Sequence, residues 1–333
     1  MIRLIKARWI DLGHCEPWEY HATYAALAQR LQPDDEPLLI WGQPAAHVCL
    51  GQSQSAAAEL AANVDVPVLQ RPLGGGTVWL DSGQCCLALV APLDLLPQRP
   101  AQWFELLLDP MAQAYREAGL PVTRVGRDLH CLGRKIAGSG AATLGRAGVV
   151  ASSFLLDFPM ARFVPTLACP STGFRRWLEE ALDGHLTWWR REGRVPAVAD
   201  LAGAFRRASN VLLGWRWVQS QLAAQELDAR LAWREELLPE AGGETRLVRH
   251  GIKIGHAVYL TETSGAWGWV RTLTHGPRIA RLALSGGDVA ESILANVFPG
   301  HDEIAAALVP RMGNGAAKWS VRILDCARFE EDL

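Results

Sequence analysis

Residues 133–140 read Gly-Arg-Lys-Ile-Ala-Gly-Ser-Gly, and the rest of this sequence is arranged around them. The chain has only four lysines, whereas the other 29 of its 33 basic residues are arginine, and one of the four, Lys135, lies here among glycines and small side chains. A lysine ammonium fits beside a phosphate or a carbonyl where a guanidinium would not, and flanking glycines let a ligand approach the backbone. The spacing favours an anion-binding lysine no more than its alternative, a β-hairpin with a surface lysine.

Two further loops have a composition that suits anion binding. Residues 71–81, RPLGGGTVWLD, contain three successive glycines, whose backbone amides can turn together toward an anion. Arg71 could clamp a phosphate or a carboxylate there, and Asp81 could orient it. Residues 126–128, Gly-Arg-Asp, offer Asp128 as a ligand for Mg²⁺ beside a phosphate. Each loop alone is equally well explained as a turn, but the three together indicate a phosphate site.

Composition and charge exclude several classes of protein. An apolar fraction of 49 % is enough for a sizeable core, and a net charge of −2 gives no basic field for nucleic acid or an anionic membrane. The N-terminus has no long apolar run after its basic residues, so we expect neither a signal peptide nor a membrane span. Seven cysteines without a CxxC pair are typical of reduced thiols, which predicts a cytoplasmic protein.

Other chemistries have weaker support in the sequence. His14, Cys15 and His21 could be drawn as a metal site, but their spacing matches no common ligand set. Cys131 is the best candidate for a cysteine nucleophile, with His130 beside it. Neighbours on a strand point to opposite faces, so His130 would not naturally activate Cys131. No GxSxG, Walker A or GxGxxG motif occurs.

The hydrophobic pattern predicts the class of fold. It indicates a helix over 101–118 and a largely helical region from 171 to 238. Two short apolar runs, 37–41 and 47–50, are expected to pair as a hairpin. Because strands and helices are mixed without regular βαβ alternation, we expect an α+β fold with a mostly antiparallel sheet flanked by helices.

The C-terminal part of the chain has a different pattern. After a break at Pro239–Gly243, short strands around glycine turns follow, and then helices expected at 289–297 and 302–309. The sequence therefore predicts a larger domain over 1–240 and a smaller α+β domain over 245–333.

These stretches together resemble the lipoate–protein ligase family, within the broader biotin/lipoate ligase fold. RPLGGGTVWLD resembles the family's RR-x-[ST]-GGG-[AT]-V-x-HD loop, GRKIAGSG its G-x-K-[IV]-x-GSA segment, and GRD its GRND turn. The resemblance extends over residues 10–238. The region after 245 resembles the small accessory domain of the long, ATP-using ligases.

The sequence also departs from the family's pattern at several positions. Gln70 replaces the first arginine of the loop, Leu73 the serine or threonine before the glycines, and Leu80 the loop histidine. The asparagine of GRND is missing, and residues 150–153 read Val-Ala-Ser-Ser where many ligases have HHGT. Gly140 replaces alanine. These departures concern the binding of Mg²⁺ and adenylate.

The resemblance implies an ATP-dependent ligase that activates lipoate as lipoyl-AMP and transfers the lipoyl group to a lysine of an acceptor lipoyl domain. It implies that Lys135 is catalytic and that Asp128 holds Mg²⁺. Substrate- and nucleotide-binding roles fall on Arg71, Gly74, Gly75, Gly76, Thr77, Val78, Asp81, Gly138 and Ser139. With Leu87, Val78 is further expected to line a tunnel for the acyl chain.

Two alternatives stay open at this point. One is an octanoyl or lipoyl transferase on the same fold, which needs a cysteine nucleophile and no ATP. The other is a non-catalytic binder of acylated protein, because several motif positions have changed. Biotin ligation has less support, because the arginine–glycine loop of biotin ligases is absent.

Overall fold

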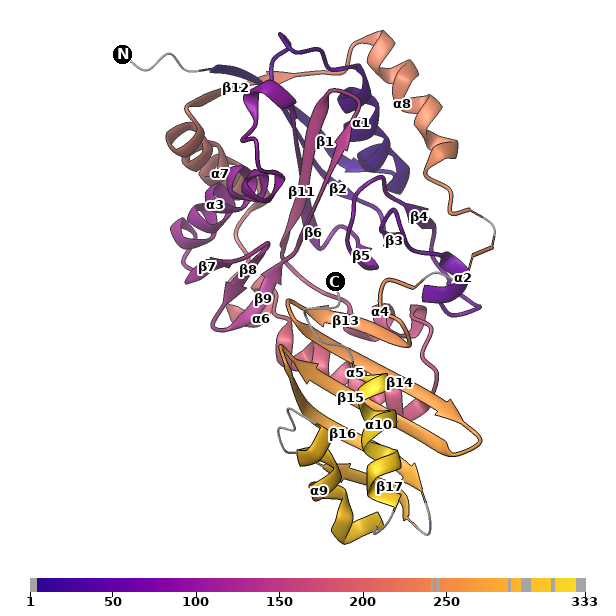
Figure 1. The fold of residues 1–333 in the computed structure, drawn as a ribbon. Coiled ribbons are helices and arrows are strands. Elements are labelled where there is room, and N and C mark those ends of the chain that lie inside the picture. The colour runs from indigo at the N-terminus through magenta and orange to yellow at the C-terminus, as the bar shows by residue number, and fades with distance from the viewer. Residues whose placement is uncertain are drawn as a thin grey trace. The chain divides into compact units, whose positions relative to one another are not determined.

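The computed structural model describes residues 5–240, 242–243, 246–286, 289–294, 301–312 and 315–327 (Figure 1). The described residues form two compact units. Unit 1 contains the residues up to Thr166 together with Leu186–Gly243. Unit 2 contains Leu167–His185 together with the described residues from 246 onward.

Unit 1 is built on a six-stranded sheet in the order β10-β11-β6-β2-β1-β12. The strands are β1 (Ile5–Cys15), β2 (Leu38–Pro44), β6 (Gln84–Pro92), β10 (Ser139–Leu144), β11 (Ala147–Leu155) and β12 (Trp215–Ser220). Neighbours from β10 to β2 pair antiparallel, whereas β1 pairs parallel with both β2 and β12. The predicted α+β fold with a mostly antiparallel sheet is confirmed.

Strand β6 lies between two cores, and all its residues are buried. Alternate side chains of a strand point to opposite faces. Cys86, Ala88 and Val90 pack on the side of helix α1 (Pro17–Arg30), which helix α8 (Ala224–Glu236) accompanies (Figure 1). Cys85, Leu87 and Leu89 pack on the side of α3 (Trp103–Glu117) and α7 (Val198–Leu213).

Two small three-stranded sheets hold the loops singled out in the sequence. One contains β3 (His47–Leu50) between β4 (Val68–Gln70) and β5 (Val78–Leu80), and the other contains β7 (Val122–Val125), β8 (Asp128–Cys131) and β9 (Arg134–Ala137). The expected hairpin of 37–41 with 47–50 is wrong. Both edges of β2 are taken by β1 and β6, so β3 pairs with β4 and β5 instead. Short helices in this unit are α2 (Ala56–Glu59), α4 (Met160–Phe163) and α6 (Trp189–Glu192).

The expectation of a largely helical region up to 238 is wrong at one place. Gly214 adopts a left-handed conformation (φ 66°) that ends α7, and Trp215–Ser220 then forms the edge strand β12. Trp215 is buried in the core with α3 and α7. This packing and the parallel pairing with β1 decide the conformation of a segment that is too short to show a period.

Unit 2 is a five-stranded antiparallel sheet with helices α5 (Thr172–His185), α9 (His301–Met312) and α10 (Ala316–Cys326). Its strands, in order, are β13 (Gly251–Gly255), β14 (Val258–Gly265), β15 (Gly268–His275), β16 (Arg278–Gly286) and β17 (Val289–Leu294). The helix expected at 289–297 is wrong over 289–294, which pairs with β16. Residues 295–297 lie outside the described residues.

Neighbouring residues of β15 point to opposite faces of this sheet. Val270 belongs to the core that α9 and α10 cover, whereas Arg271 faces α5. The Arg271 guanidinium lies over the rings of Trp177 and Trp269, at 5.2 and 4.9 Å from their centroids. Its Nε lies 2.5 Å from Oε2 of Glu262, and both side chains are almost fully buried.

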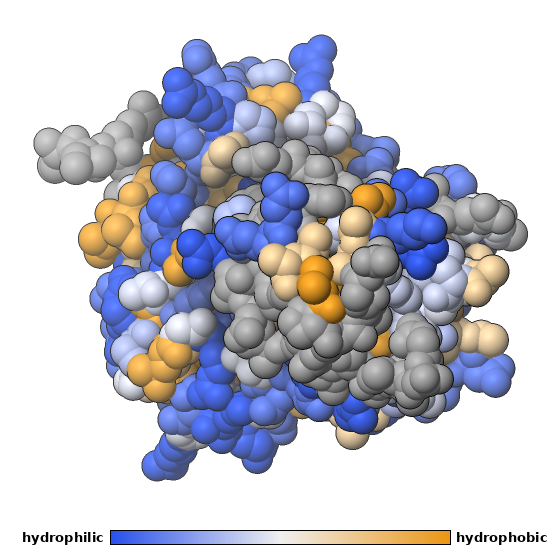
Figure 2. Space-filling view, turned by 60° about the horizontal axis from the view of Figure 1, so that its bottom comes forward, coloured by the Kyte–Doolittle hydropathy of each residue, from blue (hydrophilic) through white to orange (hydrophobic). Residues whose placement is uncertain are grey.

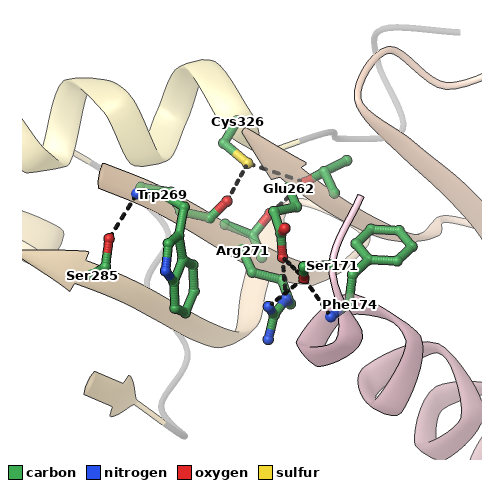
Figure 3. A network of polar contacts seen from close by, with 10 residues as sticks. Ser171, Phe174, Glu262, Trp269, Arg271, Ser285 and Cys326 are labelled. Atoms are coloured by element: carbon green, nitrogen blue, oxygen red, sulfur yellow. Dashed lines mark hydrogen bonds and ion pairs between the residues drawn. The ribbon is translucent and has the colours of Figure 1, made fainter. Parts of the chain in front are cut away.

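Ser171 extends this ion pair to the start of helix α5 (Figure 3). Its hydroxyl donates to Glu262 and accepts from Arg271 and from the backbone amide of Phe174, each at 3.0 Å. The serine therefore caps the helix and fixes it to the charged pair on the sheet.

Figure 2 shows a surface that, among its coloured residues, is mainly hydrophilic, with hydrophobic side chains in small separate groups. Single exposed apolar residues of this kind are normal on folded proteins. None of the helices in the described part of the chain is long and apolar enough to cross a membrane.

We expect Glu262→Gln to lower the free energy of unfolding of unit 2 by about 3 kcal/mol, because it leaves the Arg271 cation buried without its counter-charge. Glu180→Gln is the matched control, since Glu180 pairs with Arg281 in an exposed position where such a pair contributes less than about 1 kcal/mol. Calorimetric unfolding of the full chain measures both. Equal effects of the two substitutions would contradict a buried ion pair that stabilises unit 2.

Candidate functional site

The hairpin of β8 and β9 brings Lys135 to Asp128. Its turn has left-handed residues at Leu132 and Gly133 (φ 49° and 80°), and the register of the two strands shifts between Leu129 and His130, before the turn. Lys135 Nζ lies 2.9 Å from Asp128 Oδ1, with the two side chains 26 % and 11 % exposed. The two predicted residues therefore form an ion pair that is partly open to solvent.

Gly138 makes room for this lysine. A Cβ atom at position 138 would lie 2.8 Å from Lys135 Nζ and 2.9 Å from its Cε, so the lysine side chain lies across the glycine backbone. Ser139 donates to the carbonyl of Arg127, and Ser152 donates to the carbonyl of Gly138 at 2.7 Å. These bonds hold the 126–128 turn and the start of β10 around the lysine.

Arg71 shapes the glycine loop from the inside. It is 9 % exposed, and its Nη1 donates to the carbonyl of Cys49 at 3.0 Å. Its Nη2 donates to the carbonyls of Gly74 and Gly76, at 3.2 and 2.8 Å. The guanidinium thus binds the carbonyls of the loop, and its predicted contact with a ligand stays a prediction.

A second loop, residues 51–54, packs on the glycine loop, and sequence reasoning missed its role. Gln70 Nε2 donates to the carbonyls of Gly51, Gln52 and Gln54, at 3.3, 3.0 and 2.8 Å. Gln54 Oε1 accepts the amide of Gly51 at 2.9 Å, and its Nε2 donates to Thr77 Oγ1 at 3.1 Å. The sequence marked Gln70 as a departure from the resemblance, but it gave no signal for these partners.

The glycine loop also lies close to the lysine segment. A Cβ atom at position 140 would lie 2.9 Å from the carbonyl oxygen of Gly74. Position 140 therefore needs glycine in this structure. The contact brings together the glycine loop, β10, the lysine hairpin and the 126–128 turn, as the three motifs predicted.

Asp81 and Val78 lie at the other end of the loop. Asp81 accepts the indole N–H of Trp79 at 2.7 Å and the amide of Gly83 at 2.8 Å, so it fixes the turn into β6. Val78 packs against the core on the α1 side, whereas Leu87 is buried on the α3 side. The expectation that Val78 and Leu87 line one tunnel is therefore wrong, because the main sheet lies between them.

Cys131, the candidate nucleophile, is fully buried in the core on the α3 side. Burial raises the pKa of its thiol. A thiol with a raised pKa and no access to solvent is a poor nucleophile.

We expect Gly51→Ala to destabilise unit 1 by about 2 kcal/mol or more, because its Cβ would lie 2.0 Å from the backbone oxygen of Gly75 and force the two loops apart. Gly74→Ala, in the neighbouring glycine loop, is the control, since the nearest neighbour of its Cβ would lie at an ordinary 3.9 Å. Urea unfolding of both variants measures the difference. Similar midpoints for the two would show that the loops do not pack as described.

A family model, the lipoyl protein ligase A/B catalytic domain, matches residues 16–205. No curated protein sequence matches the chain.

Several solved structures share the fold. A structure of a bi-partite lipoate protein ligase and its E2 lipoyl domain from Thermoplasma acidophilum matches with a TM-score of 0.64 and 17 % identity, over 70 % of this chain and 93 % of that chain. Lipoate-protein ligase A bound with ATP matches at 0.59 and 17 %, over 69 % and 95 %. LipL1 of P. falciparum in complex with lipoate matches at 0.53 and 10 %, over 96 % and 99 %.

At these identities the solved structures show the fold alone. The family model, however, covers more than half of the chain, including the glycine loop and the lysine hairpin. The protein therefore belongs to the lipoyl protein ligase A/B catalytic domain family.

Proposed function

We propose that this protein is an ATP-dependent lipoate–protein ligase. In the first step the lipoate carboxylate attacks the α-phosphate of ATP, which forms lipoyl-AMP and releases pyrophosphate. In the second step the ε-amine of an acceptor lysine attacks the acyl carbonyl, loses a proton and releases AMP. The observation that carries this proposal is the ammonium of Lys135, which is partly open to solvent on the segment whose Gly140 packs against the glycine loop.

The glycine loop presents amides to a ligand because of where its carbonyls point. In a trans peptide the N–H points away from the C=O of the same unit. The carbonyls of Gly74 and Gly76 point toward Arg71, so the amides of Gly75 and Thr77 point away from that cation. Amides arranged in this way suit phosphate oxygens.

Lys135 would stabilise the charge that develops on the α-phosphate in the first step and on the acyl carbonyl oxygen in the second. A preorganised charge of this kind needs no rearrangement during the reaction. The contact with Asp128 and the backbone of Gly138 hold the side chain in place. Electrostatic stabilisation is therefore the role we assign to it.

Asp128 would hold Mg²⁺. One carboxylate is enough for this ion when substrate phosphates and water complete its shell, so the carboxylate beside Lys135 fits. The ion would supply positive charge to the ATP phosphates.

The relatives support the same substrates and partner. One is described with ATP bound, one with lipoate, and one together with its E2 lipoyl domain. We extend these to the present chain as ATP, lipoate and a lipoyl-domain acceptor. Pyrophosphate release measured with lipoate, octanoate and biotin, with and without a lipoyl domain, tests the assignment.

We further propose that the chain forms a catalytic domain over 1–240 and an accessory domain over 245–333, except that α5, which lies within 1–240, belongs to the accessory domain. Helix α5 packs on β13 and β14 and belongs to unit 2. The catalytic motifs, by contrast, all lie in unit 1.

Lys135→Ala is expected to lower the rate of pyrophosphate release at least about 100-fold, because it removes the side-chain cation assigned to the developing charge. Lys6→Ala is the control, since Lys6 forms an ion pair with Glu36 of similar length, 2.8 Å, on an exposed part of the same unit. Both variants should melt like the unaltered protein. Near-normal turnover by Lys135→Ala would refute the central role of this lysine.

Cys131→Ala is expected to retain ligation from free lipoate and ATP, because the buried thiol takes no part in the reaction. The substitution removes the thiol without burying a hydroxyl in the core. Ligation assays and mass spectrometry of the reacting protein check this. An acyl thioester trapped on Cys131 would instead support the octanoyl or lipoyl transferase.

A further inference from the structure

Three side chains with metal-binding atoms meet beneath the glycine loop, and the proposed ligase chemistry does not use them. They are His21 on helix α1 and His47 and Cys49 on strand β3, and all three are buried. One ligand atom from each lies within 4.8 Å of the other two. The sequence grouped His21 with His14 and Cys15, whereas the fold places it with two residues from another element.

The ring nitrogens of the two histidines face each other. Nε2 of His21 lies 3.0 Å from Nε2 of His47. Nδ1 of His47 lies 2.8 Å from the carbonyl oxygen of Ala45. Because a carbonyl can only accept, this Nδ1 carries the proton, and the Nε2 of neutral His47 presents its lone pair to the cluster.

His21 also has a second partner, because its Nδ1 lies 3.1 Å from the hydroxyl of Tyr24. Without metal, Nε2 of His21 carries the proton and donates to Nε2 of His47. On metal binding this proton moves to Nδ1, which then donates to the Tyr24 hydroxyl and leaves Nε2 as a ligand atom. Histidines that bind metals usually donate their other N–H to such a second partner. Both histidines therefore have the outer contacts that a metal site requires.

A third observation concerns Tyr20, on the same helix. Its ring lies 5.2 Å from that of His21 and 5.6 Å from that of Tyr24. Its hydroxyl is buried and has no hydrogen-bond partner among the described residues. The protein alone therefore does not satisfy every polar group around the cluster.

We propose that His21, His47 and Cys49 bind one thiophilic metal ion, Zn²⁺ or Cu⁺. Imidazole nitrogen and thiolate sulfur are the ligands that these ions share. Tetrahedral bonding separates such ligands by roughly 3.3 to 3.6 Å, so the two nitrogens need to part by only a few tenths of an ångström. On binding, the Cys49 thiol loses its proton to solvent and the sulfur takes the ion.

The charge around the site distinguishes the two ions. Cys49 supplies one negative charge, and Arg71 lies beside it, with Nη1 bound to the carbonyl of Cys49 at 3.0 Å. Cu⁺ with one thiolate is neutral, whereas Zn²⁺ leaves a buried positive charge near that cation. The three-ligand set therefore favours Cu⁺, and Zn²⁺ would need a fourth ligand.

The ion would fasten strand β3 to helix α1 under the loop. Arg71 joins the Cys49 carbonyl to those of Gly74 and Gly76. The metal would thus fix the position of strand β3, to which Arg71 joins the glycine loop, without contacting the reacting atoms.

The test uses the full-length protein freed of metal with a chelator and titrated with Cu⁺, Zn²⁺ or Co²⁺, the last as a coloured substitute for zinc. We expect one equivalent to bind, a thiolate-to-cobalt absorption band to appear, and the melting temperature to rise. Cys49→Ala should weaken binding about 100-fold and abolish the band. Cys85→Ala is the control, because Cys85 is equally buried but packs on the other face of the sheet.

X-ray absorption of the metal-loaded, unaltered protein gives a readout that does not depend on whether a variant folds. One sulfur and two imidazoles around the ion would support the site. No tight equivalent in the folded protein, a shell without sulfur, or an unchanged cobalt band in Cys49→Ala would overturn it. Any of these results would leave the histidines as a plain hydrogen-bond chain.

Discussion

The guanidinium of Arg71 is the contact on which the candidate site depends. Three backbone carbonyls converge on it, one from β3 and two from the glycine loop. Carbonyl dipoles that point at one another repel, and a loop of this curvature brings its carbonyls close together, so they need a cation between them. Gly75 is needed for the same reason, since its φ is 103° and a Cβ there would lie 3.1 Å from Arg71 Nη2. A single side chain therefore determines both the shape of the loop and the direction of its amides.

The lysine site follows a different rule, in which small residues leave space for a long one. Lys135 reaches Asp128 only because Gly138 lacks a side chain, and Gly140 lets the glycine loop approach β10. Two positive groups, Arg71 and Lys135, thus have separate tasks. Arg71 donates its hydrogen bonds to backbone carbonyls and is buried. Lys135 stays partly exposed and pairs with the carboxylate of Asp128. This division explains why an arginine serves in one place and a lysine in the other.

The sequence was informative where a residue type was rare in the chain. Lys135 was notable in an arginine-rich protein, and its glycines predicted that a ligand approaches the backbone there; in the structure the Lys135 side chain approaches Gly138 and the glycine loop approaches Gly140. Partners distant in sequence were not predictable. Gln70 holds the 51–54 loop through three backbone carbonyls, and His21 meets His47 across two elements, neither of which leaves a periodic signal. Strand β12 was not predictable for a similar reason. It pairs with β1, which lies far from it in the sequence.

Helix α5 shows how the order of the chain connects the two units. It has an apolar face typical of any amphipathic helix, and nothing in the sequence names the sheet that buries it. The structure places Trp177 of this helix against Arg271 and Arg281 of unit 2. Directly after α5, in unit 1, Leu186 forms a bridge with Lys135, and the amide of Thr187 donates to the Lys135 carbonyl at 2.8 Å. The chain thus passes from unit 2 directly to a segment that pairs with the strand of the proposed catalytic lysine. A protein ended near residue 240 would keep α5 without the strands that cover it, so the break at Pro239–Gly243 does not by itself separate the two units.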